Sequence, residues 1–244
     1  MLGSFTFGKV LKTFLPGATL AGALLLLLES VGWFSWRRSM LWYLSDKDRL
    51  TALVTLLLPV SLLLGFLLNT VVWVSVNPAK KTHARAEVDK RFVGLRDVIA
   101  RVRDSELSEL RTDAPDAKPW PRESFEYYFL CSVEVERLAH LWESYFSWYE
   151  FHINSAFAIP LFAGSTALYA GLSFFGAGPL VGHCLLAGAT VLVSVATGVA
   201  CLVGLSKSAT RNLVEYEKGL LLLIAGSLRK TEKPGAPAPA KTGS

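Results

Sequence analysis

The chain has 244 residues, of which 52% are apolar, and its mean hydropathy of +0.38 is too high for an ordinary soluble domain. The formal net charge of +5 lies mostly between long apolar blocks, so it indicates contact with anionic lipid headgroups and does not indicate nucleic acid. Cys131, Cys184 and Cys201 have none of the close spacings of a metal or redox motif, and we expect them to pack as small apolar residues.

Four apolar blocks are long enough to cross a bilayer, which takes roughly 20 residues of α-helix. They are residues 14–36, 50–76, 153–175 and 180–205. Lys9 and Lys12 precede the first block, as in a signal peptide. That block is long for the apolar part of a signal peptide, however, and Trp33 and Trp36 suit a membrane interface better than a cleavage site. The sequence therefore predicts an all-α fold with four transmembrane helices.

The distribution of basic residues predicts the orientation. Four spans place both termini and residues 77–152 on one side of the membrane. Near the span ends, that side carries Lys9, Lys12, Lys80, Lys81, Arg85, Lys90, Arg91, Arg137, Lys207, Arg211 and Lys218. The opposite side carries only Arg37, Arg38, Lys47 and Arg49. Because basic loops stay in the cytoplasm, we expect both termini inside, in the cell (inner) membrane.

Residues 77–152 form the predicted cytoplasmic insert. Apolar residues repeat there at steps of four and three, which predicts an amphipathic helix. They are Val88, Phe92, Leu95, Ile99 and Val102. This stripe either packs against its own chain or docks a partner. Three prolines between residues 115 and 121 predict a loop, and an aromatic helix then runs from about Glu123 into the third span. The insert is thus predicted to be a helical hairpin beneath the membrane.

The C-terminal part repeats Leu213, Tyr216, Leu220 and Leu223 at helical spacing, which predicts an amphipathic cytoplasmic helix over residues 206–230. The tail that follows is rich in Pro, Ala, Lys and Gly, cannot bury a core, and is expected to be disordered. The predicted domains are a first membrane hairpin (1–76), the insert (77–152), a second membrane hairpin (153–205), the amphipathic helix (206–230) and the tail (231–244).

Small residues recur every four positions in the third and fourth spans, where they let helix backbones approach closely. One row is Ala163, Ala167 and Gly171; another is Ala196, Ala200 and Gly204; a third is Thr190, Ser194 and Gly198. The four-residue link between these spans requires an antiparallel hairpin. Either the small rows serve that hairpin alone, or a row that the hairpin leaves unused packs between subunits. The leucine-rich first and second spans are expected to face lipid.

Polar side chains inside spans are costly, which makes them candidates for function. Glu29, near the outer end of the first span, either reaches the interface or serves in pairing or a pore. Asn69 either bonds between helices or lines a polar path. His152 and Asn154 mark the inner entrance of the third span, and Ser194 is a pore candidate in the fourth.

Catalytic signatures are absent from the sequence: it contains no HExxH, P-loop, GxGxxG, GxSxG or CxxC motif. Glu136, His140 and Glu143 share a helix face and carry groups that bind transition metals. Di-iron helices use paired Glu-x-x-His motifs, and this chain has no such pair, so local pairing is the simpler interpretation. We therefore expect no enzyme activity, no cofactor and no metal.

The Phe14-Leu15-Pro16-Gly17 opening of the first span and the charged helical insert between two membrane hairpins give the chain a recognisable layout. It resembles that of small multi-pass membrane effector proteins of bacterial antiphage and conflict systems. The resemblance covers architecture, and no functional residue is carried over. It implies a homo-oligomer that disturbs membrane integrity or passes ions when triggered.

Two functional hypotheses follow from the sequence. The first is an oligomeric, pore- or channel-like effector in antiphage defence, gated by its cytoplasmic helices. The alternative is a non-conducting membrane scaffold or anchor that docks a cytoplasmic protein or a small ligand through residues 78–150. A polar stripe continuous along the axis of the oligomer would distinguish the first hypothesis from the second.

Overall fold

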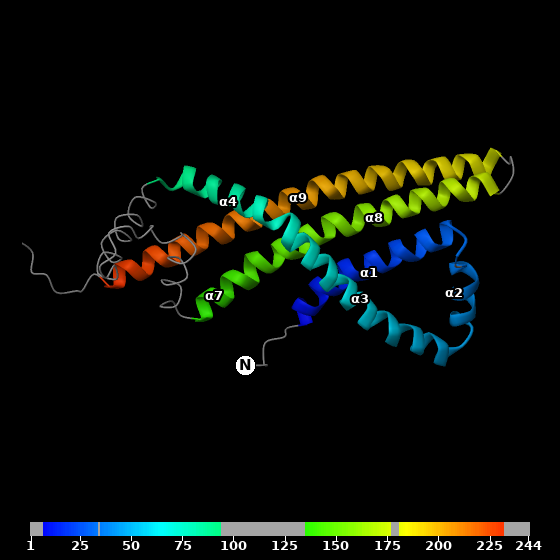
Figure 1. The fold of residues 1–244 in the computed structure, drawn as a ribbon, viewed down its shortest axis with the longest axis horizontal. Helices are drawn as coiled ribbons and strands as arrows, with labels where there is room; N and C mark the ends of the chain where they lie inside the picture. The colour runs from blue at the N-terminus through cyan, green and yellow to red at the C-terminus, as the bar shows by residue number, and fades with distance from the viewer. Residues whose placement is uncertain (1–6, 34, 94–134, 177–180, 232–244) are drawn as a thin grey trace, which may run out of the picture. The chain divides into compact units, whose positions relative to one another are not determined.

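The computed structural model describes residues 7–33, 35–93, 135–176 and 181–231, and these are the residues meant throughout (Figure 1). All regular structure in this part of the chain is helical, as predicted. The helices are α1 (Phe7–Ser30), α2 (Trp36–Leu44), α3 (Lys47–Ser75), α4 (Asn77–Arg91), α7 (Val135–Leu141), the π-helical turn η1 (Trp142–Phe146), α8 (Ser147–Gly176) and α9 (Val181–Thr231). The predicted proline loop, most of the predicted amphipathic stripe and the tail after residue 231 lie outside the described residues.

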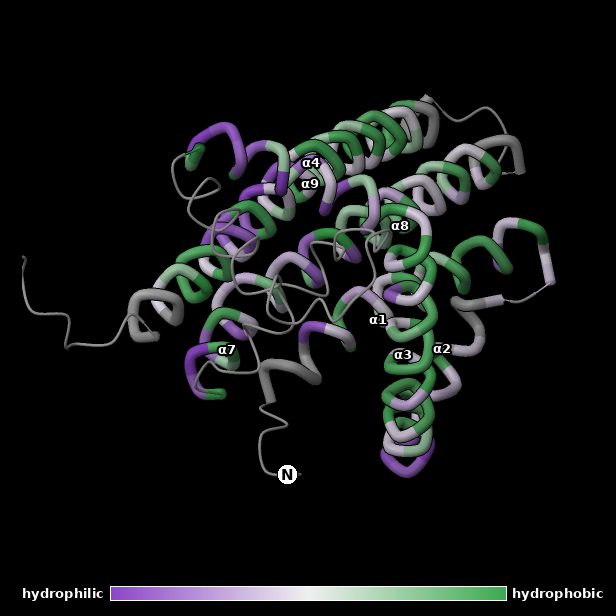
Figure 2. Tube along the Cα trace, turned by 60° about the vertical axis from the view of Figure 1, so that its left-hand side comes forward, coloured by the Kyte–Doolittle hydropathy of each residue, from purple (hydrophilic) through white to green (hydrophobic). Residues whose placement is uncertain are grey.

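Four helical stretches are long and apolar enough to cross a membrane. They are Lys12–Ser30, Lys47–Ser75, Val135–Ser173 and Leu185–Gly226, in the order of the four predicted spans. Figure 2 shows apolar residues along nearly the whole of α3, whereas α4 is strongly polar. These findings support the prediction of a membrane protein with four transmembrane helices.

The first span ends earlier than predicted, at Ser30, because of Gly32. Gly32 has a φ of 75°, which favours glycine. The Gly32 amide donates to the Glu29 carbonyl at 3.0 Å, and the Trp33 amide donates to the Leu28 carbonyl at 3.1 Å. This pair of hydrogen bonds is a Schellman motif, which closes an α-helix.

The short helix α2 was not predicted. Asp46 follows it and caps α3, because its Oδ1 accepts a hydrogen bond from the Asp48 amide at 2.9 Å. The Arg49 guanidinium lies 4.2 Å from the centre of the Trp42 ring. Trp33 and Trp42 are exposed, at 84% and 52%, as residues of an interfacial aromatic belt would be in a single chain.

The described residues belong to two compact units, which are treated separately. Unit 1 comprises residues 1–81 and 145–213, and unit 2 comprises residues 82–144 and 214–244. Helices α4 and α9 contribute to both units. Helix α9 continues without interruption past Leu205, where the sequence predicted the fourth span to end. The predicted separate amphipathic helix of residues 206–230 is therefore part of α9, and its amphipathic role stays a prediction.

In unit 1, α1 packs against both α3 and α8 (Figure 1). The first span, predicted to face lipid, therefore packs against these helices on part of its surface and is exposed on the rest. Its small residues Gly17, Ala21 and Ala23 are buried, whereas Leu15 and Leu24 remain exposed. Small residues on one face of a leucine-rich helix can therefore be buried against other helices, while leucines on another face stay exposed.

Helices α1 and α3 cross with their backbones in contact. A Cβ added to Gly17 would collide with the Ser61 carbonyl, and one added to Gly65 would collide with the Thr13 carbonyl. By contrast, no residue of α3 before Ser61 is buried. The second predicted span is thus buried at its crossing with α1 and exposed along much of its length.

The contact of α8 with α9 involves Gly198. A Cβ added there would lie 3.1 Å from the Ala163 Cβ and 3.6 Å from the Pro160 Cα. This contact agrees with the predicted hairpin of the third and fourth spans and uses the row that contains Gly198. The other row on α9, Ala196, Ala200 and Gly204, is exposed in the single chain, and Ala167 and Gly171 on α8 are half-buried. Packing of the exposed row between subunits stays a prediction.

Unit 2 contains most of α4, the short helix α7 and the end of α9. Ala84, Val88 and Ile224 are fully buried. The Trp142 and Tyr216 rings meet edge to face, with centroids 6.4 Å apart. Burial of Val88 favours packing of the predicted stripe against its own chain at that position.

Candidate functional site

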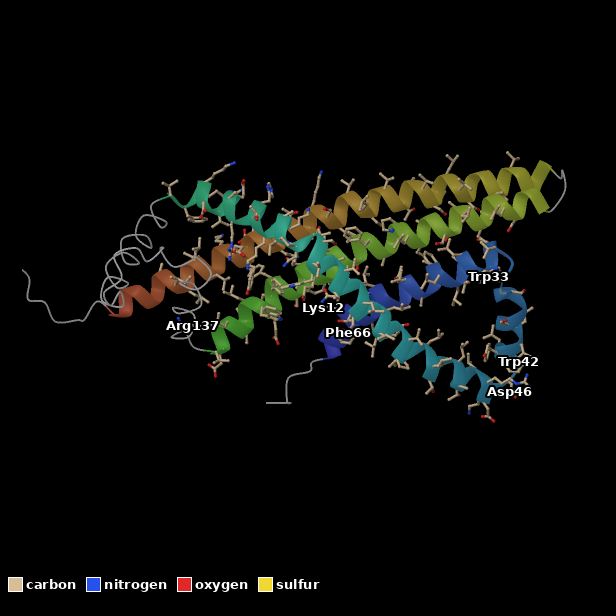
Figure 3. All side chains as sticks on the ribbon, viewed as in Figure 1. Lys12, Trp33, Trp42, Asp46, Phe66 and Arg137 are labelled. Atoms are coloured by element: carbon tan, nitrogen blue, oxygen red, sulfur yellow. The ribbon has the colours of Figure 1, made fainter. Side chains whose placement is uncertain are left out.

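Polar side chains of five helices form hydrogen bonds between helices in unit 1. We call this set the polar cluster. It comprises Lys12 of α1, Asn69 of α3, Asn77 and Lys80 of α4, Ser147, Tyr149, Glu150, His152 and Asn154 of α8, and Ser206, Thr210 and Asn212 of α9. Figure 3 labels Lys12 near the crossing of α1 and α3, and Trp33 and Asp46 towards the opposite ends of these helices. Lys12 therefore lies towards the end of α1 that is opposite to Trp33.

Asn69 and Asn154, which the sequence singled out separately, bond to each other. The Asn154 Nδ2 donates to the Asn69 Oδ1 at 3.0 Å. Asn154 is only 4% exposed, and its Oδ1 has no hydrogen-bond partner within the described part of the chain. Of the two roles weighed for Asn69, the structure supports the bond between helices.

His152 lies between aromatic rings and bonds to α9. The Asn212 Nδ2 is 3.0 Å from the His152 Nδ1, which accepts this bond when the ring proton is on Nε2. The ring centroids of Trp148 and Phe151 are 5.8 and 5.6 Å from that of His152. Asn212 was not predicted, because its separation of 60 residues from His152 gives no local pattern.

Lys12 joins α1 to the start of α8. Its Nζ donates to the Ser147 Oγ at 2.8 Å and lies 4.1 Å from the centre of the Trp148 ring. The half-buried Glu150 follows one turn after Ser147. Its carboxylate interacts electrostatically with Lys12 and through a hydrogen bond with Asn69. Ser147, Glu150 and Asn154 are spaced three and four residues apart, and this helical periodicity is the one sequence signal that linked them.

Helix α4 bonds to both α8 and α9 within unit 1. Tyr149 is 1% exposed, and its Oη donates to the Asn77 Oδ1 at 2.9 Å. The Lys80 Nζ donates to the Ser206 Oγ at 3.1 Å and to the Thr210 Oγ1 at 3.0 Å. These bonds hold the first turn of α4, from Asn77 to Lys80, against two other helices.

Glu29 and Ser194 do not belong to the polar cluster. The Tyr169 Oη of α8 donates to the Glu29 Oε1 at 3.5 Å, so the pairing role weighed for Glu29 has a partner in the same chain. Ser194 is half-buried on α9 in the row that contains Gly198. Of the pore candidates from the sequence, Asn69, His152 and Asn154 therefore belong to the polar cluster, whereas Glu29 and Ser194 lie elsewhere.

Hydroxyl groups on exposed helix faces bond to their own helix. Such bonds run from each Thr or Ser Oγ to the carbonyl four residues earlier, as for Thr55, Thr70, Ser75, Thr166 and Thr190. A hydroxyl bonded in this way is tolerated in lipid, because its donor is satisfied locally.

His140 makes a local contact one turn along its own helical segment. The Ser144 Oγ lies 3.5 Å from the His140 Nδ1. Within the described ranges, no three His, Cys, Asp or Glu side chains are grouped closely enough to hold a metal ion. The described side chains therefore offer no metal centre on which to base a mechanism.

Comparison with known proteins gave no match to a protein-family model, a curated protein or a solved structure. The class of protein accordingly rests on the helices themselves. Four apolar helices of membrane-spanning length, with polar side chains paired between them, are compatible with a multi-pass membrane protein.

Proposed function

We propose that this chain is a membrane scaffold: a non-conducting helical anchor that holds a helical module outside the bilayer, where a cytoplasmic protein docks. The observation that carries this proposal is the engagement of the intramembrane polar groups. Asn69 and Asn154 bond to each other, and Glu29 bonds to Tyr169. A polar side chain whose hydrogen bond joins two helices of one chain is not available to line a pore.

The exposed membrane faces support the same proposal. Exposed side chains of α3 and α9 include Val54, Leu63, Val71, Leu192 and Val199, all between 56% and 72% exposed. Exposed hydroxyls on these helices bond to their own backbone, as Thr70 does. Such faces match lipid tails and offer little to an ion pathway.

The module outside the bilayer would be unit 2. Helices α4 and α9 reach it directly from unit 1, and α8 connects to it through η1 and α7. Unit 2 has its own buried core, which includes Val88 and Ile224, and a buried ion pair between Arg85 and Glu217 at 3.2 Å. A packed helical module with exposed charged residues such as Lys90 is suited to docking a soluble protein in the cytoplasm.

A liposome flux measurement tests the non-conducting part of the proposal. The purified full chain would be reconstituted at several protein-to-lipid ratios, and its mass in detergent would be measured in parallel. A scaffold leaves ion flux at the level of empty liposomes at every ratio. Flux that rises with protein content and is changed by Asn154→Leu would contradict it.

Docking needs a separate test in cells. A photo-crosslinking residue at Lys90, which is exposed on α4, would be compared with one at Leu63, which is exposed on α3. We expect a discrete adduct with one soluble protein from position 90 only. Adducts that are the same from both positions would argue against a docking role for unit 2.

The second candidate is the oligomeric pore-like effector in antiphage defence, gated by its cytoplasmic helices. Two observations favour it. The buried Asn154 Oδ1 has no partner among the described residues, and water in a polar path would supply one. The exposed row Ala196, Ala200 and Gly204 offers a surface for subunit contact. The same flux experiment separates the two candidates, because this one requires conduction by an oligomer of defined mass.

A further inference from the structure

One face of α9 changes from apolar to basic within a single helical turn. Val195, Val199 and Val203 are 52%, 57% and 48% exposed. They are four residues apart, so they form one row along the helix. The next two positions in this row are Lys207 and Arg211, and both side chains are exposed.

The length of this row matches one leaflet of a bilayer. Twelve residues separate Val195 from Lys207, which is about 18 Å along an α-helix. Half of a hydrocarbon core that is roughly 30 Å thick is about 15 Å. When the valines lie among the acyl chains, Lys207 and Arg211 therefore lie at the level of the lipid headgroups.

Further cationic groups lie beside the basic end of the row. The Lys80 ammonium bonds to Ser206 and Thr210, which directly precede Lys207 and Arg211 in the sequence. Lys81 follows Lys80 and belongs to the same unit. Glu150 is also in unit 1, and its half-buried carboxylate already interacts with the Lys12 ammonium and the Asn69 amide. Glu215, the next position of the row, is acidic, and its carboxylate accepts a hydrogen bond from the Lys218 Nζ at 3.1 Å. The cations Lys80, Lys81, Lys207 and Arg211 therefore outnumber the carboxylates at this end of the row.

We propose that this row binds one anionic phospholipid, with its phosphate between Lys207 and Arg211 and an acyl chain along Val195, Val199 and Val203. Arg binds phosphate through two parallel N–H groups, and the Lys ammonium adds a point charge one turn away. A free phosphate would use the basic end and leave the valines without a role. The length of the apolar row therefore favours the lipid.

A second copy of the chain fits the row less well. Subunits of a homodimer in a membrane share one orientation, so their two-fold axis lies along the membrane normal. That symmetry would bring Lys207 and Arg211 of each copy close to the same residues of the other. Like charges at this distance repel, whereas an anionic headgroup is attracted.

Native mass spectrometry of the purified full chain tests the proposal. Phosphatidylglycerol and phosphatidylcholine with the same acyl chains would be titrated into the wild type and the Lys207→Gln/Arg211→Gln variant. We expect the wild type to prefer phosphatidylglycerol by about tenfold or more, since each basic residue near a headgroup contributes roughly fivefold. The double variant should bind the two lipids equally.

A matched control removes the same amount of charge elsewhere. Lys47→Gln/Lys90→Gln alters two exposed lysines outside the row and should keep the preference for phosphatidylglycerol. Inorganic phosphate would be titrated in the same way. Three results would overturn the proposal: equal binding of both lipids by the wild type, an undiminished preference in the Lys207→Gln/Arg211→Gln variant, or binding of inorganic phosphate as tight as that of phosphatidylglycerol. A change in oligomer mass with unchanged lipid preference would instead assign the row to a second copy.

Discussion

The backbones of Gly17 and Gly65 approach so closely that a Cβ on Gly17 would lie 2.7 Å from the Gly65 amide nitrogen. The same Cβ would collide with the Ser61 carbonyl. Because backbone atoms of both helices form this contact, a side-chain rotation cannot relieve it. The two glycines therefore allow α1 and α3 to cross at this point.

Gly17→Ala should consequently separate α1 from α3 and lower the thermal stability of the purified protein, by an amount typical of overpacking, about 1–3 kcal/mol or more. Gly164→Ala is the matched control, because a Cβ at Gly164 meets nothing within 4 Å. That control should be neutral or slightly stabilising, since Ala is the better helix former. Equal melting temperatures for Gly17→Ala and wild type would show that the crossing is looser than described.

The bond between Asn69 and Asn154 should appear as a coupling energy. In a double-mutant cycle with alanine at both positions, we expect a coupling of about 0.5–2 kcal/mol in detergent unfolding, the range for polar contacts between membrane helices. A control cycle pairs Asn154→Ala with Ser75→Ala, whose hydroxyl bonds to the Val71 carbonyl of its own helix. Additive effects in the first cycle would mean that the two amides act independently.

The sequence predicted the helical class and the four spans, because 20-residue apolar blocks have few alternatives in a chain of this composition. It could not predict which face of each span is buried. In lipid, leucine gains little by burial, and backbone approach is decided by single small residues such as Gly17 and Gly65. Neither glycine belongs to the rows recognised at intervals of four.

For the candidate site, the sequence identified the members that stand out among apolar neighbours, such as Asn69 and Asn154. It did not identify Lys12, Asn77 or Asn212 as members of the site. Their partners are 135, 72 and 60 residues away in the chain. Contacts over such separations depend on how the helices pack, which local periodicity does not encode.

The ion pair of Arg85 with Glu217 should be far more sensitive to substitution than exposed pairs. Glu217 is 2% exposed and Arg85 is 16% exposed, whereas the Arg91–Glu87 pair is 63% and 34% exposed. Arg85→Ala would remove this guanidinium from a buried carboxylate, which costs about 3–5 kcal/mol. Arg91→Ala should cost about 1 kcal/mol or less.

Chemical unfolding of the full chain, compared between the wild type and each variant, would measure this difference. The double variant Arg85→Leu/Glu217→Leu should recover much of the stability lost in Arg85→Ala, because no buried charge remains. Equal losses for Arg85→Ala and Arg91→Ala would contradict the burial of the pair.

The final prediction separates packing within the chain from packing between chains. Gly198 contacts Ala163 and Pro160, whereas Ala200 is exposed on another face of α9. Gly198→Leu should therefore lower the thermal stability of the chain itself. Ala200→Leu should leave the unfolding of the single chain nearly unchanged, because its added atoms point away from α8. If the exposed row packs between subunits, Ala200→Leu should also lower the oligomer mass measured in mild detergent.

Leu63→Ala is the control for Ala200→Leu, since it changes a 60% exposed side chain on α3 and leaves the row Ala196, Ala200 and Gly204 of α9 intact. It should alter neither stability nor mass by a measurable amount. An Ala200→Leu protein with wild-type mass and wild-type stability would place Ala196, Ala200 and Gly204 against lipid and remove the basis for subunit contact through this row. A loss of single-chain stability equal to that of Gly198→Leu would instead show that α9 turns its other face to α8.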